Sequence, residues 1–282
     1  QNRFLFLFLQ RQGLDQAPSS TVEELSRLNY EAVVQAKTYL NLAHLQAYTG
    51  EFNFKRALAR YCSSADALVN ASSLKNAFKY YEGRDLNWFF DKTVKSAEIY
   101  DYQLRDYDHC ATVSTASIYN TGDLSVPYSI TGFKEGKAII TEWFDGHEGL
   151  RDVQIYHDDF DKIVINAHLS HAEFNQKNNT YYDRWFLPRM EPLSFQFYNS
   201  FEAPEATQVF YMPSVYYNAY DKLLLGVSLS NRSFLVQKPF EYNLIPEYST
   251  GTSKLTGSAS FRYNHTLPKN NFFRQFQIGL YG

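Results

Sequence analysis

The chain has 282 residues, of which 44% are hydrophobic and 20% are charged, a composition typical of globular rather than disordered proteins. Its 27 Lys and Arg residues are balanced by 30 Asp and Glu residues, which argues against the basic surface that nucleic acid binding requires. The length predicts two or three domains. Aromatic residues make up 17% of the chain.

The two cysteines, Cys62 and Cys110, predict neither a disulfide framework nor a cysteine-based zinc site. No apolar run reaches the roughly 18 residues that indicate a transmembrane helix. The apolar stretch Phe4–Leu9 lacks the charged flank and the small-residue cleavage site of a signal peptide. We therefore expect the chain to begin inside a longer protein.

Residues 1–96 are predicted to be helical, because apolar residues recur there at steps of three and four. Ser20, followed three positions later by Glu23, has the pattern of a capping box and predicts a helix from Thr21. Gly50 is expected to end the next helix, and Asp85 to cap the last one. The predicted apolar stripes consist of Ala36, Leu40, Ala43 and Ala47; Phe54, Ala57, Leu58 and Tyr61; Leu74, Ala77, Phe78 and Tyr81; and Leu86, Trp88, Phe89 and Phe90.

Residues 97–182 show alternation with a period of two, which is typical of strands. Strands are predicted over 101–107, 125–130, 136–143 and 162–167, separated by turn-forming clusters such as Asn120–Asp123. Short strands at this spacing predict a small immunoglobulin-like β-sandwich.

Residues 183–282 are predicted to form an antiparallel, aromatic-rich β region. Apolar and polar residues alternate over 254–264 and 273–281, a pattern that strands of outer-membrane proteins share. Residues 205–282 have room for five or six such strands, so the region is expected to be either barrel-like or a meander. The predicted fold is thus a multidomain α + β chain with boundaries near residues 96 and 182, and membrane association is expected through 205–282.

Few residues have the spacing of a catalytic or metal site. His168 and His171 form an HxxH pattern, but in a strand these positions point to opposite faces and do not share an ion. His147 and Glu148 begin an HExxH-like pattern that ends on Arg151 instead of histidine. The acidic residues Asp158, Asp159 and Asp161 are expected to form a solvated turn. We therefore expect no metal ligands and no cofactor-binding residues in this chain.

Three segments in order, Leu28–Gly50, Phe54–Tyr61 and Gly83–Asp91, resemble the aminopeptidase N-like gluzincin metallopeptidases, in the part of the family that follows the zinc motif. The resemblance covers about residues 1–182 and points to an envelope protein of the Bacteroidota type. It implies that 1–96 is the helical remnant of a peptidase domain and that 97–182 is the β domain that follows it.

Two departures from the family limit what the resemblance implies. The HExxH motif and the third ligand, a glutamate, lie upstream of this region in the family, so zinc is expected only if an upstream peptidase motif exists. Gln35 stands where the family has the tyrosine that binds the oxyanion, two residues before Lys37. Losing one oxyanion donor typically raises the barrier by about 2.7–4 kcal/mol.

Two functional expectations follow. The first is a non-catalytic C-terminal portion of an aminopeptidase N-like metallopeptidase or pseudopeptidase, inactive alone, that scaffolds the peptidase domain in the periplasm or outer membrane and has peptides or the missing peptidase domain as partners. The alternative is an envelope-associated binding or anchoring module that uses its aromatic strands to contact a membrane or a partner sheet.

Overall fold

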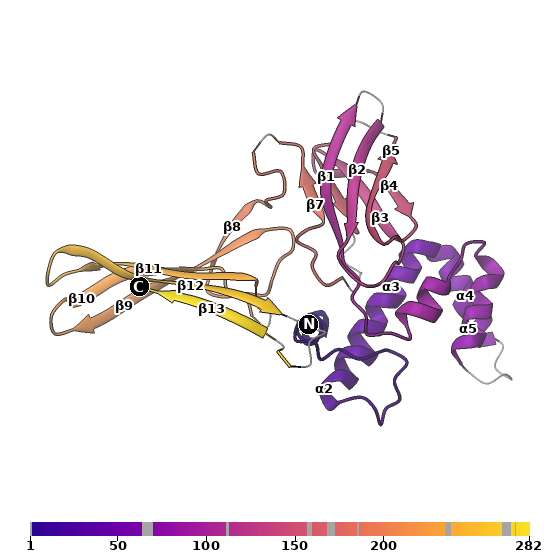
Figure 1. The fold of residues 1–282 in the computed structure, drawn as a ribbon, viewed down its shortest axis with the longest axis horizontal. Coiled ribbons are helices and arrows are strands. Elements are labelled where there is room, and N and C mark those ends of the chain that lie inside the picture. Colours follow the sequence, from indigo (N-terminus) through magenta and orange to yellow (C-terminus); the bar gives the residue numbers. More distant parts are fainter. Residues whose placement is uncertain are drawn as a thin grey trace. The chain divides into compact units, whose positions relative to one another are not determined.

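A computed structural model describes residues 2–63, 70–110, 113–156, 160–167, 173–184, 186–234, 238–266, 272–273 and 275–282 (Figure 1). These residues divide into two compact units. One unit combines residues 3–14 with 191–282, and the other comprises residues 15–190. Each unit is described by itself below. The predicted boundaries at residues 96 and 182 stay a prediction.

The helices of the 15–190 unit largely follow the predicted stripes. They are α2 (Arg27–Asn29), η1 (Tyr30–Lys37), α3 (Thr38–Thr49), α4 (Glu51–Ser63), α5 (Ala71–Tyr81) and η2 (Trp88–Thr93). Gly50 follows α3 with a φ of 81°, which confirms its predicted role, since glycine adopts positive φ without a steric penalty. Among the described residues, no helix combines the length and the apolarity that crossing a membrane requires.

The predicted start at Thr21 is wrong. The backbone N–H of Thr21 donates to the Glu24 carboxylate at 2.9 Å, in a turn rather than a helix. The helix begins at Arg27, where the hydroxyl of Ser26 accepts the N–H of Asn29 at 3.2 Å. Ser26 thus satisfies the first free backbone donors instead of Ser20.

Two of the helices, η1 and η2, have the wider π-helical turn, which no hydrophobic stripe predicts. A threonine follows or ends each of them. Thr38 and Thr93 donate their hydroxyl groups to the carbonyl oxygens of Val33 and Trp88, five positions earlier, each at 2.9 Å. These hydroxyls satisfy backbone acceptors where the regular ladder is interrupted.

Seven strands follow in this unit: β1 (Tyr102–Cys110), β2 (Val113–Asn120), β3 (Tyr128–Lys134), β4 (Lys137–Phe144), β5 (Gly149–Ile155), β6 (Lys162–Ile165) and β7 (Thr180–Tyr182). They form two antiparallel sheets, with strand orders β1-β2-β5 and β4-β3-β6-β7. The four predicted strands correspond to β1, β3, β4 and β6. The immunoglobulin-like assignment stays a prediction.

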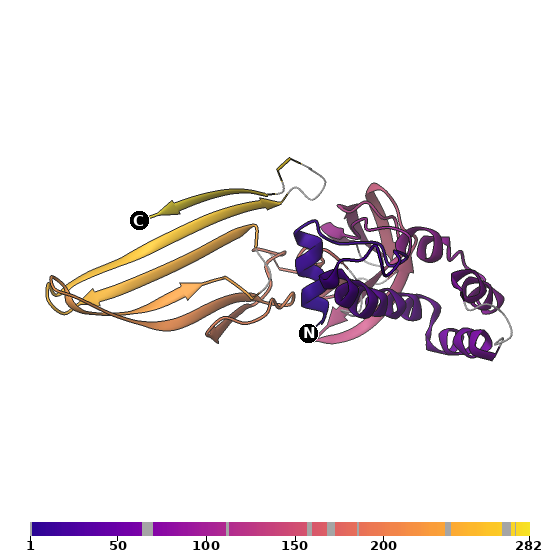
Figure 2. The ribbon, with the colours of Figure 1, turned by 90° about the horizontal axis from the view of Figure 1, so that it is seen from below.

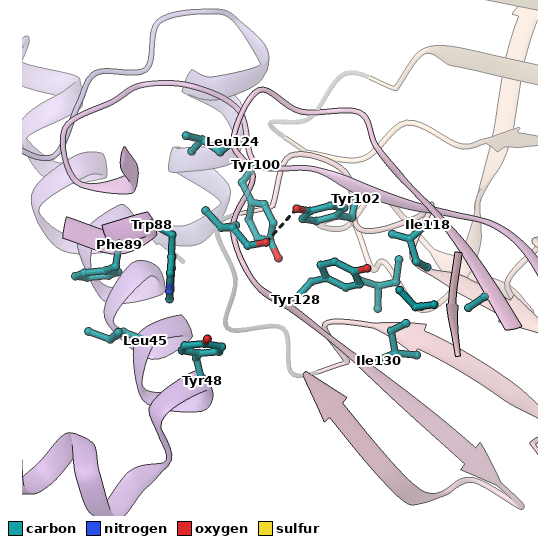
Figure 3. Packing of buried hydrophobic residues seen from close by; sticks show 14 of the residues in the cluster. Leu45, Tyr48, Trp88, Phe89, Tyr100, Tyr102, Ile118, Leu124, Tyr128 and Ile130 are labelled. Atoms are coloured by element: carbon teal, nitrogen blue, oxygen red, sulfur yellow. Dashed lines mark hydrogen bonds between the residues drawn. The ribbon is translucent and has the colours of Figure 1, made fainter. Parts of the chain in front are cut away.

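Helices and strands of this unit share one hydrophobic core. Leu45, Tyr48 and Phe89 from the helices belong to the same buried cluster as Ile118 and Ile130 from the two sheets (Figure 3). Burial of apolar surface stabilises a fold, so one cluster shared by the helices and the two sheets stabilises all three together. The helical region is therefore held on the strands as one body.

The second unit contains α1 (Asn2–Arg11) and one sheet of six strands, ordered β13-β12-β11-β10-β9-β8 (Figures 1 and 2). Its strands are β8 (Leu193–Phe197), β9 (Thr207–Asn218), β10 (Lys222–Ser230), β11 (Phe240–Ser249), β12 (Lys254–Thr266) and β13 (Gln275–Tyr281). Strands β9–β13 form an antiparallel meander, as one of the two alternatives predicted. Strand β8 corrects the prediction of a wholly antiparallel region, because it pairs with β9 in parallel. The sheet is open, with β8 and β13 at its edges.

Helix α1 is tied to the start of this unit. The ring of Phe4 stacks on that of Phe201, with centroids 4.5 Å apart. The guanidinium of Arg11 lies 3.0 Å from the carboxylate of Glu202. The first helix of the chain thus contacts residues that are far away in the sequence; Arg11 and Glu202 are 191 positions apart.

Candidate functional site

Gln35 and Lys37 both lie on η1, but their side chains have different surroundings. Gln35 is exposed. Lys37 is buried, and its ammonium donates to the Asp15 carboxylate at 2.7 Å and to the carbonyl oxygen of Gln16 at 3.2 Å. Its contacts make Lys37 a structural residue that fixes the segment before α2 against η1. The oxyanion role implied for the position of Gln35 stays a prediction.

The Lys37–Asp15 pair is isolated from water, since each side chain is only 5% exposed. Burial lowers the pKa of Lys37 and raises that of Asp15, and the attraction between the two charges opposes both shifts. A pair of this kind is costly to break, because removing one partner leaves the other charge without compensation in a buried site.

The histidine patterns do not form a metal site in the part of the chain that the structure describes. His44 is buried, with its Nε2 atom 2.9 Å from the carbonyl oxygen of Pro127 and its ring near those of Trp88 and Trp143. The Nε2 atom of His147 lies 3.1 Å from the carbonyl oxygen of Ile118, and burial lowers its pKa. Within the described ranges, no group of His, Cys, Asp and Glu has the geometry to hold a metal ion.

Other predicted positions fall partly outside the described residues. His168, His171, Asp158 and Asp159 lie outside them. Asp161 is within them and lies 3.4 Å from the ammonium of Lys134, with half of its side chain exposed. This contact agrees with the expected solvated turn.

Glu173 is a buried carboxylic acid that no sequence pattern indicates. It lies in the segment between β6 and β7 and contacts the start of β1. Glu173 is only 1% exposed and accepts hydrogen bonds from the N–H of Tyr102 at 3.1 Å and from the amides of Asn166 at 3.2 Å and Asn179 at 2.7 Å. Burial, followed by the nearby carboxylate of Asp101, raises the pKa of Glu173 to about 8. Its three donors come from separate segments, so Glu173 joins them.

The most extensive candidate site is one face of the six-stranded sheet, which we call the apolar face. Residues that are paired across strands, or that lie two apart along one strand, share a face. By this register the apolar face contains Leu193, Phe195, Phe197, Val209, Tyr211, Val215, Tyr217, Leu223, Leu225, Val227, Leu229, Phe240, Tyr242, Leu244, Tyr248, Leu255, Phe261, Tyr263, Phe276, Ile278 and Leu280, together with Thr207, Pro213, Pro246, Gly257, Ala259 and His265.

The apolar face is exposed to a degree that is unusual for large hydrophobic side chains. Leu255 is 84% exposed, Leu280 69% and Val215 67%. No Asp, Glu, Lys or Arg occurs on this face in any of the described strands. Contiguous apolar patches of this kind mark sites of interaction with a protein or a membrane.

The opposite face of the same sheet, the polar face, is rich in hydroxyl, amide and charged groups. Ser214 donates to the Glu247 carboxylate at 2.8 Å, a contact between β9 and β11. The guanidinium groups of Arg232 and Arg262 lie 3.3 and 3.8 Å from the carboxylate of Glu241. Apolar and aromatic side chains also occur on this side: Phe210 and Leu224 are buried, whereas Met212, Tyr216 and Tyr281 are exposed. The two faces thus differ in composition: hydroxyl, amide and charged groups of the strands lie on the polar face, and most of the large hydrophobic residues lie on the apolar face.

A pocket of about 280 Å³ opens on the polar face. It is lined mainly by polar-face residues of β9, β10 and β11 and by residues next to them, namely Tyr198, Asn199, Phe210, Tyr211, Met212, Ser228, Ser230, Arg232 and Asn243. The hydroxyl of Ser228 donates to Asn243 at 2.8 Å, so two of its polar groups already bond to each other.

Comparison with known proteins gives few matches. No protein-family model matches the chain, and no curated protein does. Aminopeptidase A from Legionella pneumophila, solved in complex with aspartic acid, is similar in structure with a TM-score of 0.44 and 14% identity, over 56% of this chain and 19% of that chain. The likeness is too weak to assign an activity, and this chain spans less than two thirds of that protein.

Proposed function

We propose that this chain is a non-catalytic anchoring module of the cell envelope, in which the six-stranded sheet attaches the protein to an apolar surface. The observation that carries the proposal is the distribution of side chains on the sheet. The apolar face carries exposed hydrophobic residues from all six strands, whereas the other face carries the charged groups of the strands and most of their hydroxyl and amide groups, several of which hydrogen-bond to one another. A sheet that faced only water on both sides would expose polar residues instead.

The test is the solution behaviour of the whole chain with and without detergent. We expect association into large species in detergent-free buffer and a single monodisperse species in a mild nonionic detergent. Leu225→Lys/Leu255→Lys, which places two charges on the apolar face, should reduce the association. Thr256→Lys/Ser258→Lys places the same two charges on the polar face and should not. A wild-type chain that is monodisperse without detergent would contradict the proposal.

A second candidate function is a scaffold for the peptidase domain of an aminopeptidase N-like metallopeptidase or pseudopeptidase. The shared core favours it, because helices that resemble the end of a peptidase domain are fixed to the strands that follow them. We expect the purified chain to hold no stoichiometric zinc and to leave aminoacyl p-nitroanilides uncleaved. Elemental analysis and a hydrolysis assay check this, and zinc together with turnover would refute it.

A further inference from the structure

We propose that strands β9–β12 cross a lipid bilayer, with the apolar face against lipid acyl chains and the polar face against water. The inference rests on the proposed anchoring function and specifies its partner and its orientation. Three properties of the sheet carry it: the chemistry of the two faces, the length of the strands and the position of the charged residues.

The chemistry of the apolar face favours hydrocarbon over a protein partner. Protein interfaces surround an apolar centre with a polar rim and carry about one hydrogen bond per 100–200 Å². The apolar face has no charged residue in any of its six described strands, and most of its members are aliphatic or aromatic. Acyl chains need no hydrogen-bonding groups, so this composition suits them.

Strand length favours crossing over lying flat on the membrane surface. A tilted strand crosses the hydrocarbon layer in about 9–11 residues. The central strands β9, β10, β11 and β12 contain 12, 9, 10 and 13 residues. Each is therefore long enough to cross once.

Charged residues lie at the ends of the strands or on the polar face. Asp221 lies in the turn between β9 and β10, and Lys222 and Lys254 begin β10 and β12 at the same end of the sheet. Tyr217 and Tyr248 occupy the apolar face near that end, while Val227 lies in its middle. Aromatic rings near the ends and small or aliphatic residues between them are typical of strands that meet both membrane interfaces.

The polar face then has to border water, because Glu241, Glu247 and Arg262 carry charges that are costly to place in hydrocarbon. Crossing also requires the edge strands β8 and β13 to pair with further strands, since unpaired backbone groups are not tolerated among acyl chains. A second copy or another strand-bearing segment would meet this need.

The test uses the whole chain reconstituted into phosphatidylcholine vesicles, with single cysteines in a Cys62→Ser/Cys110→Ser background. Val227→Cys and Leu255→Cys report on the apolar face. Ser228→Cys and Thr256→Cys are their sequence neighbours on the polar face. We expect a water-soluble maleimide to label each apolar-face thiol roughly tenfold more slowly than the thiol at the neighbouring polar-face position. The reason is that the reactive thiolate is excluded from hydrocarbon.

Depth measurements separate crossing from lying flat. A fluorophore on Val227→Cys should be quenched best by lipids brominated near the end of the acyl chain, and one on Leu255→Cys by lipids brominated near the headgroup. Equal depths, equal labelling of neighbouring positions, or no association with vesicles would each overturn the inference. If the chain is monodisperse only in detergent but does not associate with vesicles, the anchoring function stands and the partner of the apolar face is a protein instead of lipid.

Discussion

Glu173 makes the stability of the 15–190 unit depend on pH. Because its pKa is raised in the folded state, the folded protein binds this proton more tightly than the unfolded chain does. Its contribution to stability is therefore complete below about pH 4.5 and is lost as the pH rises to about 8. Within that window one such group changes the free energy of unfolding by at most about 1.4 kcal/mol per pH unit.

Glu173→Gln should remove this dependence. Between pH 5 and 8 we expect the free energy of unfolding to fall less steeply in the variant than in the wild type. The difference in slope should be at most about 1.4 kcal/mol per pH unit. The slope is the useful readout, since an amide cannot reproduce all three hydrogen bonds and the absolute stability will fall as well. Urea unfolding at several pH values measures it. Glu148→Gln, at an exposed carboxyl, is the control and should keep the wild-type slope.

Lys37 gives a second prediction for a single residue. Lys37→Met leaves the buried carboxyl of Asp15 without its partner and should lower the free energy of unfolding by about 3–5 kcal/mol. Lys55→Met breaks a solvent-exposed pair with Glu51 and should lower the free energy of unfolding far less than Lys37→Met does. Chemical denaturation of both variants compares them. Similar losses would show that the burial of the Lys37–Asp15 pair is unimportant.

Among the elements, β3 depends on a close approach at Gly132. A Cβ atom at this position would lie 2.2 Å from the ring of Phe160, which is itself buried in the core. Gly132→Ala should therefore destabilise the protein by about 1–3 kcal/mol through overpacking. Adding Phe160→Leu should recover part of that loss, and a double-mutant cycle from thermal or urea unfolding measures the coupling. Additive effects would show that the two positions do not compete for space.

The elements also show what could be predicted from the sequence. Strands β12 and β13 alternate almost strictly, so their positions and their two faces follow from the pattern. The sequence of β2 does not alternate between apolar and polar residues, because its buried positions are occupied by Ser114 and Asn120 as well as by Ala116 and Ile118. The π-helical turns depend on where one extra residue is accommodated and on the hydroxyl of Thr38 or Thr93, which a search for apolar stripes ignores.

The candidate site was predicted only in part, for a related reason. Alternation over 254–264 and 273–281 indicated strands with one apolar and one polar face, but not that β8 adds to the same sheet in parallel from residue 193. Glu173 was missed because its burial depends on β1, 71 positions away at Tyr102, and on Asn166 and Asn179, whose amides the chain brings to its carboxylate only when folded. Burial that arises from tertiary contacts leaves no local pattern.

At the scale of the whole molecule, the 15–190 unit has a complete core of its own. All members of its main buried cluster lie between Leu45 and Ile165. We expect a chain limited to residues 15–190 to unfold cooperatively, to be monodisperse without detergent and not to bind vesicles. Circular dichroism, chromatography and flotation check this. If the isolated unit bound vesicles, the apolar face would not be the main site of membrane attachment.

The alternation of the two faces restricts which changes in chain length β9–β13 can accept. Inserting or deleting one residue in a strand reverses the direction of every side chain beyond it, so that Leu and Phe move to the polar side and Ser and Glu to the apolar side. A change of two residues preserves the faces. Lengthening or shortening within these strands is thus expected only in even steps. The turn at Tyr220 and Asp221 lies outside the strands, so this restriction to even steps does not apply there.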